Sequence, residues 1–155
     1  MALFTSTYIN KIDRKGRVSV PAQFRSELSN QPFQGIIVFR SFKVPALECF
    51  SREQMEQLSA RLGQFDLFSD EQDDLAATIL GGSTPLAFDA DGRISLPSGL
   101  AEHAGITEQA AFCGRGPTFQ IWDPETLAKH QADARARVRS KGLTIPSKAP
   151  PQNNS

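Results

Sequence analysis

The residues that could do chemistry are cations gathered in one short stretch near the start of the chain. Between positions 10 and 25 a single acidic side chain, Asp13, is outnumbered by five basic ones, which gives this stretch a formal charge of +4. The five cations are Lys11, Arg14, Lys15, Arg17 and Arg25. Guanidinium groups donate paired hydrogen bonds to phosphate or guanine, and ammonium groups bind phosphate as point charges. The stretch therefore predicts a DNA-binding surface, with a solvated basic face as the alternative.

The rest of the composition places this basic stretch in an ordinary folded chain. Seventeen Lys and Arg balance seventeen Asp and Glu over 155 residues, so only the local distribution of charge points to a partner. A hydrophobic content of 39% with 11 Phe is enough to build a core. No apolar run is long enough to span a bilayer, and the N-terminus lacks the pattern of a secretory signal. Cys49 and Cys113 have no metal-binding or redox motif around them, so we expect two buried, reduced thiols in a cytoplasmic protein.

No enzyme motif accompanies the cations. The sequence contains no phosphate-binding P-loop, no zinc-protease His-Glu-x-x-His and no Gly-x-Ser-x-Gly nucleophile elbow. His103 and His130 are isolated, and Asp13 and Asp89 would have to converge in a pocket to act as an acid and a base. The sequence therefore predicts a binding protein rather than an enzyme, without a cofactor, a metal or a small-molecule substrate.

The basic stretch belongs to a hairpin that occurs twice. Residues 12–21 align without a gap with residues 88–97, and five of the ten positions are identical. The shared residues are Asp13 and Asp89, Gly16 and Gly92, Arg17 and Arg93, Ser19 and Ser95, and Pro21 and Pro97. In each copy glycine supplies the positive φ of a tight turn, and the aspartate can hydrogen-bond the turn and pair with the arginine. Strand alternation predicts Val18 and Val20 on one face of the strand, and Arg17 and Ser19 on the other face.

The similarity between the two copies continues beyond the hairpins. Each hairpin is followed by a short helix (22–28 and 98–104), two strand segments (36–40 with 47–51, and 110–114 with 119–123) and a longer helix (52–62 and 124 to about 140). Ser51 and Asp123 are suitable N-caps for the longer helices. A helix over 70–80 with an acidic first turn separates the copies and ends at Gly81-Gly82. We expect a first repeat over 1–62, a connecting segment over 63–86, a second repeat over 87–140 and a mobile tail over 141–155, with both repeats in one structural domain.

Charge distinguishes the two hairpins. The second, over residues 86–101, carries Arg93 against Asp89 and Asp91 and has a formal charge of −1. A purely structural motif would not require this difference. We therefore expect the first hairpin to contact DNA and the second to shape the fold or contact another subunit.

This pattern resembles the MraZ family of bacterial transcriptional regulators. The resemblance rests on two Asp-x-x-x-Arg hairpins in one chain, on Val20-Pro21-Ala22 and on the segment 119–122, and it covers about residues 4–130. It implies an α+β fold in which the two repeats form a swapped-hairpin, AbrB-like β-barrel with flanking helices. It also identifies Arg17 and Arg93 as the motif arginines, Asp13 and Asp89 as the motif aspartates and Lys15 as the usual turn lysine.

The same resemblance implies a function and a setting. Family members bind direct repeats in promoter DNA of the division and cell-wall gene cluster and assemble into ring-like homo-oligomers, so we expect double-stranded DNA as the partner and a nucleoid-associated location in the cytoplasm. The helix over 70–80 is acidic where the family is often arginine-rich, so we expect no DNA contact from it. The alternative is an antitoxin-like interaction module of the same fold, although the short tail after Lys141 offers few apolar anchors for a toxin.

Overall fold

The computed structural model describes residues 1–147, so most of the expected mobile tail lies outside the described residues. The chain divides into two compact units, Met1–Pro124 and Glu125–Ser155. The first unit holds the sheets of both repeats, and the second contains the long helix α5 (Pro124–Lys141) from its second residue onward. No helix in the described part of the chain is long and apolar enough to cross a membrane.

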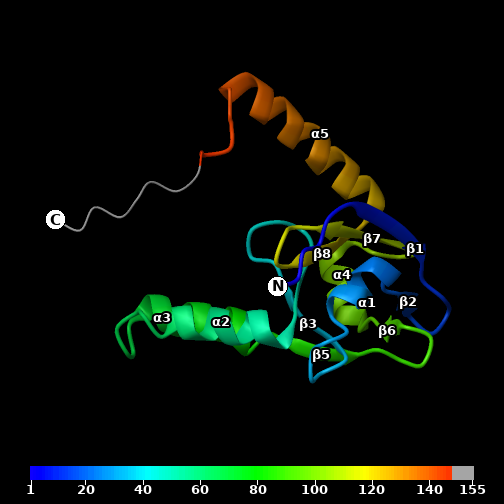
Figure 1. The fold of residues 1–155 in the computed structure, drawn as a ribbon, viewed down its shortest axis with the longest axis horizontal. Helices are drawn as coiled ribbons and strands as arrows, with labels where there is room; N and C mark the ends of the chain where they lie inside the picture. Colours follow the sequence, from blue (N-terminus) through cyan, green and yellow to red (C-terminus); the bar gives the residue numbers. More distant parts are fainter. Residues whose placement is uncertain (148–155) are drawn as a thin grey trace. The chain divides into compact units, whose positions relative to one another are not determined.

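The order of elements in the first repeat recurs in the second, as predicted (Figure 1). The first repeat contains β1 (Thr7–Lys11), β2 (Arg17–Ser19), α1 (Ala22–Glu27), β3 (Gly35–Arg40), β4 (Leu47–Phe50) and α2 (Arg52–Leu62). The second contains β5 (Thr84–Ala87), β6 (Arg93–Ser95), α4 (Ser98–Ala104), β7 (Gln109–Gly114), β8 (Phe119–Trp122) and α5. Between them lie α3 (Asp70–Leu75) and the π-helical turn η1 (Ala76–Leu80), which together occupy the predicted acidic helix.

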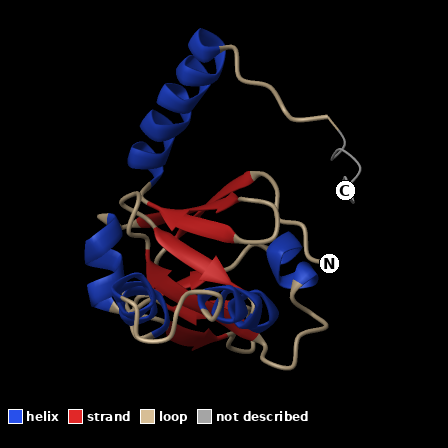
Figure 2. Cartoon of the chain, turned by 90° about the vertical axis from the view of Figure 1, so that its left-hand side faces the viewer, coloured by secondary structure: helices blue, strands red, loops and turns tan. Residues whose placement is uncertain are grey.

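The strands of the two repeats are interleaved. One antiparallel sheet has the order β1-β7-β8-β4-β3-β5, and a second sheet contains β2 and β6 alone. The first repeat's β1 pairs with β7, its β3 with β5, its β4 with β8 and its β2 with β6, so each repeat supplies strands to the other. Figure 2 shows these strands in the middle of the first unit with helices around them. The prediction of exchanged hairpins is therefore confirmed.

The closed β-barrel that was expected does not form in the described residues. The larger sheet ends at β1 and β5, and the link from the end of β1 toward the small sheet is a single bridge between Ile12 and Val18. The physical reason is the length of β2 and β6. Each is three residues long and pairs with the other, so neither continues the sheet from one edge to the opposite edge.

The largest hydrophobic cluster of the described residues contains side chains of both repeats and holds them together. It includes Val18 and Phe24 from the first repeat and Ile94 and Phe119 from the second, all with 1% of their surface exposed. The Phe24 ring lies 5.2 Å from Phe4, and 4.8 Å from Phe119 across the repeat boundary, measured between ring centroids. Each aromatic ring buries a large apolar surface, so neither repeat retains its core without the other. Cys49 is buried, which raises the pKa of its thiol, whereas Cys113 is only half-buried.

The helices α2 and α3 form a helical hairpin with its own small core. Ser51 caps α2, because its Oγ accepts a hydrogen bond of 3.1 Å from the backbone N–H of Gln54. Phe39 of β3, Met55 of α2 and Ile79 of η1 are buried together where the hairpin joins the sheet. The loop between the two helices lies at the far end of the hairpin, away from the strands (Figure 1).

Candidate nucleic-acid interface

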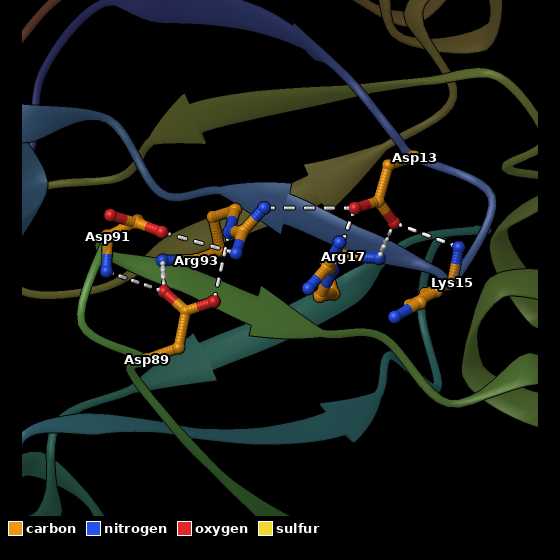
Figure 3. A network of polar contacts seen from close by, with 6 residues as sticks. All are labelled: Asp13, Lys15, Arg17, Asp89, Asp91 and Arg93. Carbon is orange, nitrogen blue, oxygen red and sulfur yellow. Dashed lines mark hydrogen bonds and ion pairs between the residues drawn. The ribbon is translucent and has the colours of Figure 1, made fainter.

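The two hairpins meet in a short ribbon formed by β2 and β6. Val18 faces Ile94 at its centre, Arg17 faces Ser95, and Ser19 faces Arg93. Val18 and Ile94 point into the core, which leaves the arginines and serines on the outer face, as strand alternation predicts. Because the strands are antiparallel, the two turns lie at opposite ends of the ribbon and the two arginines lie between them (Figure 3).

The first turn is organised by the carboxylate of Asp13. Its Oδ1 accepts hydrogen bonds of 2.9 Å from the backbone N–H groups of Lys15 and Arg17. Its Oδ2 accepts one of 2.7 Å from Nε of Arg17. Gly16 has a φ of 78°, in the left-handed region that favours glycine. The aspartate thus fixes both the backbone of the turn and the direction of the motif arginine, which confirms the predicted pairing.

The second turn repeats this geometry with more negative charge around its arginine. Asp89 Oδ1 accepts from the N–H groups of Asp91 and Arg93 at 2.9 Å, and its Oδ2 accepts from Nε of Arg93 at the same distance. Arg93 also lies 3.3 Å from a carboxylate oxygen of Asp91 and 3.8 Å from one of Asp13. Three carboxylates therefore surround Arg93, whereas within the described residues Arg17 pairs with Asp13 alone. Arg17 keeps more of its positive potential for an outside ligand.

Both motif aspartates are stabilised in their charged form. The backbone N–H of Arg17 lowers the pKa of Asp13, with further lowering from the Arg17 side chain and the N–H of Lys15. The backbone N–H groups of Arg93 and then Asp91 do the same for the pKa of Asp89. Hydrogen bonds to a carboxylate favour its charged state, so both turns keep their anionic anchor at neutral pH.

Four of the five predicted cations gather at the first turn. Arg14 and Lys15 are exposed at its tip, and Lys11 is exposed at the end of β1, one residue before the hairpin begins. In the described part of the chain none of these three takes part in an ion pair. Together with Arg17 they form a cationic end of the ribbon with free donors, the arrangement expected for binding phosphate.

Arg25, the fifth predicted cation, lies at the second turn. Its Nε donates a hydrogen bond of 3.0 Å to the carbonyl of Val20. A Cβ atom placed on Gly92 would come within 2.5 Å of the guanidinium carbon, so the guanidinium lies directly against that turn. Proximity in the sequence had grouped Arg25 with the first hairpin. The exchange of hairpins instead packs α1, which carries Arg25, against the second hairpin. The swapped-hairpin fold implied by the family resemblance was the one feature of the sequence that pointed to such an exchange.

A matching pocket lies beside each turn. Arg25 lines the pocket next to Gly92, and Ala101, its equivalent 76 positions later, lines the pocket next to Gly16. Arg14 and Lys15 also line the first pocket, and Asp89 and Ala90 line the second. Each turn therefore has a positive charge beside it, which reduces the difference in charge between the two hairpins that the sequence predicts. No group of His, Cys, Asp or Glu suited to a metal ion occurs among residues 1–147.

Sequence reasoning missed one positioning residue of the ribbon. The Asn10 side-chain amide donates a hydrogen bond of 2.7 Å to the carbonyl of Ser19. This bond ties β1 to the end of β2 that faces Arg93, on the side of the second turn. No motif in the sequence singles out Asn10, so only the three-dimensional structure reveals this contact.

The sequence of this chain is similar to known proteins of one family. Residues 3–77 and 79–141 match the family model described as "MraZ protein, putative antitoxin-like". The chain is 46% identical over 136 residues to the "Transcriptional regulator MraZ" of Pelagibacter ubique, covering 88% of each protein. It is 42% identical to the protein of that name from Gluconacetobacter diazotrophicus (92% of each chain) and 38% identical to that from Rickettsia akari (94% of this chain, 97% of the relative).

Proposed function

The chain belongs to the MraZ family of transcriptional regulators, and from that premise we propose that it binds double-stranded promoter DNA through its first hairpin. The observation that carries this proposal is the cationic end of the ribbon, where Arg14 and Lys15 are exposed and where, among residues 1–147, Arg17 has a single carboxylate partner. The target is a promoter with direct repeats in the division and cell-wall gene cluster, and the protein acts as a ring-like homo-oligomer on the nucleoid.

The size of the cationic surface supports binding by an assembly. A two-stranded ribbon fits the major groove of DNA, where arginine can read guanine. Four cations at one turn allow about three or four phosphate contacts, which corresponds to a salt slope of roughly −3 to −4 for each subunit. Such a footprint gives weak binding near physiological salt. Several subunits, each on one repeat of the site, raise the overall affinity through effective concentration.

Arg25 adds a contact at the other end of the ribbon. Its guanidinium lies against Gly92 beside Asp89, so it offers one further phosphate contact there. The remaining cation of that turn, Arg93, is occupied by three carboxylates. The second turn therefore supports binding, while the first turn reads the DNA.

Fluorescence anisotropy with a labelled promoter fragment and a scrambled fragment tests this proposal. We expect Arg17→Ala to lose affinity mainly for the promoter, and Lys15→Ala to lose affinity for both fragments and to reduce the salt slope by about one. Arg52→Ala is the matched control, because Arg52 is an exposed arginine of α2 that also pairs with an acidic residue four positions away. Promoter binding by Arg17→Ala equal to that of the wild type, at fixed salt, would show that the first hairpin is not the reader.

A further inference from the structure

The loop between α2 and α3 exposes three large apolar side chains within four residues. Phe65 is 43% exposed, Leu67 is 75% exposed and Phe68 is 86% exposed. Single exposed apolar residues are common on folded proteins, but a cluster of this kind marks an interaction site. We call residues 65–74 the acidic tip, because they also include Asp66, Asp70, Glu71, Asp73 and Asp74 and no basic residue, for a formal charge of −5.

The acidic tip holds its aromatic side chains outward on a defined backbone. Phe68 has a φ of 65°, a left-handed conformation that is costly for a bulky residue. The turn is closed by a hydrogen bond of 3.0 Å from the N–H of Ser69 to the carbonyl of Asp66. Ser69 then caps α3, since its Oγ accepts from the N–H of Gln72 at 3.2 Å. Residues held in strained conformations of this kind cluster at functional sites.

A second exposed feature of the same chain has the opposite charge. We call residues 40–45, from the last residue of β3 into the connection to β4, the basic loop. It contains Arg40 and Lys43, both exposed, and no acidic residue. Phe42 is 66% exposed and is the one exposed aromatic residue outside the acidic tip in residues 1–147. The buried Ser41 orders this loop, because its Oγ accepts hydrogen bonds of 3.2 Å from the N–H groups of Lys43 and Val44.

We propose that the acidic tip of one copy of the chain docks on the basic loop of the next copy. Each feature offers exposed aromatic surface, and their charges are opposite. Contact between two acidic tips would bring together two segments that each carry a formal charge of −5, and contact between two basic loops would also bring like charges together. Both features stay exposed within a single chain, and the 11-residue helix α2, about 16 Å long, carries the tip away from the sheet (Figure 1). A second copy therefore supplies the partner surface.

This contact joins two different surfaces and is therefore directional. Repeated from copy to copy, a contact of this kind closes into a ring or continues as a filament. The first turn is more basic than the loop, but its tip presents Arg14 and Lys15 without an exposed aromatic residue. Docking on the basic loop leaves that turn free for DNA. The inference rests on the assembly part of the proposed function, and its test is separate from DNA binding.

Molar mass measured by light scattering after size-exclusion chromatography tests the contact. We expect the full-length wild type to exceed the monomer mass of 17.0 kDa, and Phe68→Ser and Phe42→Ser each to elute as monomers. Each variant retains one intact surface, so an equal mixture of the two should form a dimer and nothing larger. Lys43→Glu should weaken assembly, and Lys43→Glu combined with Asp70→Lys should restore it in part. Ile145→Ser, which alters another exposed apolar residue, is the matched control and should assemble as the wild type does.

The outcomes separate this contact from the rest of the proposed function. Assembly of both single variants at the wild-type mass overturns the contact and leaves DNA binding untouched. A mixture that stays monomeric, although circular dichroism shows both variants folded, overturns the directional pairing. Loss of assembly in Lys15→Glu but not in Lys43→Glu moves the docking site to the first turn and overturns the assignment of the basic loop. A monomeric wild type that still binds promoter DNA tightly overturns the assembly and retains the DNA-binding proposal.

Discussion

The guanidinium of Arg93 lies 3.8 Å from the carboxylate of Asp13, 80 positions earlier in the chain (Figure 3). The same carboxylate oxygen accepts a hydrogen bond of 2.7 Å from Arg17. One aspartate oxygen therefore faces the motif arginine of each repeat. The residues that shape the first turn therefore also contact the motif arginine of the second turn on the common ribbon.

The two motif aspartates predict a loss of stability in acid. Hydrogen bonds lower the pKa of Asp13 and Asp89 in the folded chain from the usual value of 3.8. A lowered folded pKa contributes stability that is present above pH 3.8 and is lost as the pH falls through the folded pKa. We expect the free energy of unfolding to lose this contribution below pH 3.8, and Asp13→Asn with Asp89→Asn to show a shallower loss. Urea denaturation from neutral pH to pH 3 measures it, and an unchanged pH dependence in the double variant would contradict the assignment.

The turn glycines predict a matched pair of stability effects. Gly16 and Gly92 have φ values of 78° and 77°, so alanine at either position costs about 1–2 kcal/mol of folding free energy. At Gly92 the new Cβ would also come within 2.5 Å of the guanidinium carbon of Arg25 and displace that side chain. Gly16→Ala meets only the carbonyl of Leu96, at 3.4 Å. We therefore expect thermal unfolding to show losses at both sites, with the larger loss for Gly92→Ala. Equal or smaller loss at Gly92 would mean that Arg25 is not held against the turn.

Most of the fold follows from local signals in the sequence. The repeated hairpin, its glycine turns and the alternation of Val18 with Arg17 predict the ribbon, and the cap at Ser51 predicts the start of α2. These features depend on neighbouring residues, so the sequence carries them directly. The pairing of β1 with β7 and of β3 with β5 depends on contacts between distant segments. Only the family resemblance predicted this exchange of strands. The same resemblance predicted a closed β-barrel, which does not form in residues 1–147 because the strands β2 and β6 are too short to close it.

The candidate site, like the fold, could be predicted from the sequence only where its residues are close together in the chain. Lys11, Arg14, Lys15 and Arg17 gather as expected, because they lie on one strand end and one turn. Arg25 lies elsewhere because its helix packs against the hairpin of the other repeat. The extra carboxylates around Arg93 were partly visible as Asp89 and Asp91, but the approach of Asp13 required the three-dimensional structure. Proximity in sequence therefore predicts contacts within a hairpin and fails for contacts between repeats.

The aromatic centre of the core predicts a large loss of stability on truncation. Phe24 is 1% exposed and its ring lies within 5.5 Å of the rings of Phe4, Tyr8 and Phe119, measured between centroids. Phe24→Ala removes this packing and leaves a cavity, which costs about 3–5 kcal/mol. Leu3→Ala, at a residue 61% exposed, should change stability by no more than about 0.5 kcal/mol. The midpoints of urea denaturation curves, provided that the slopes are equal, compare the stability of the two variants. A small effect of Phe24→Ala would show that the core repacks around the cavity.

The equivalent positions of Arg25 and Ala101 allow the two turns to be compared by exchanging a charge. Arg25→Ala removes a cation from the second turn, so we expect weaker DNA binding and a salt slope smaller by about one. Ala101→Arg adds a cation to the pocket beside Gly16, where the carbonyl of Leu96 can accept from it as that of Val20 accepts from Arg25. We expect this variant to bind DNA more tightly, with a salt slope larger by about one.

The double variant Arg25→Ala with Ala101→Arg decides between position and total charge. It keeps the net charge of the wild type but moves one cation from the second turn to the first. If the first turn reads the DNA, the double variant should bind at least as tightly as the wild type and clearly more tightly than Arg25→Ala alone. Anisotropy titrations over a range of salt concentrations measure this, with mass measurements confirming equal assembly. Because both variants lack Arg25, equal affinity for the double and the single variant would show that a cation beside the first turn gains no contact with DNA, which would contradict the assignment of this pocket to the DNA-binding surface.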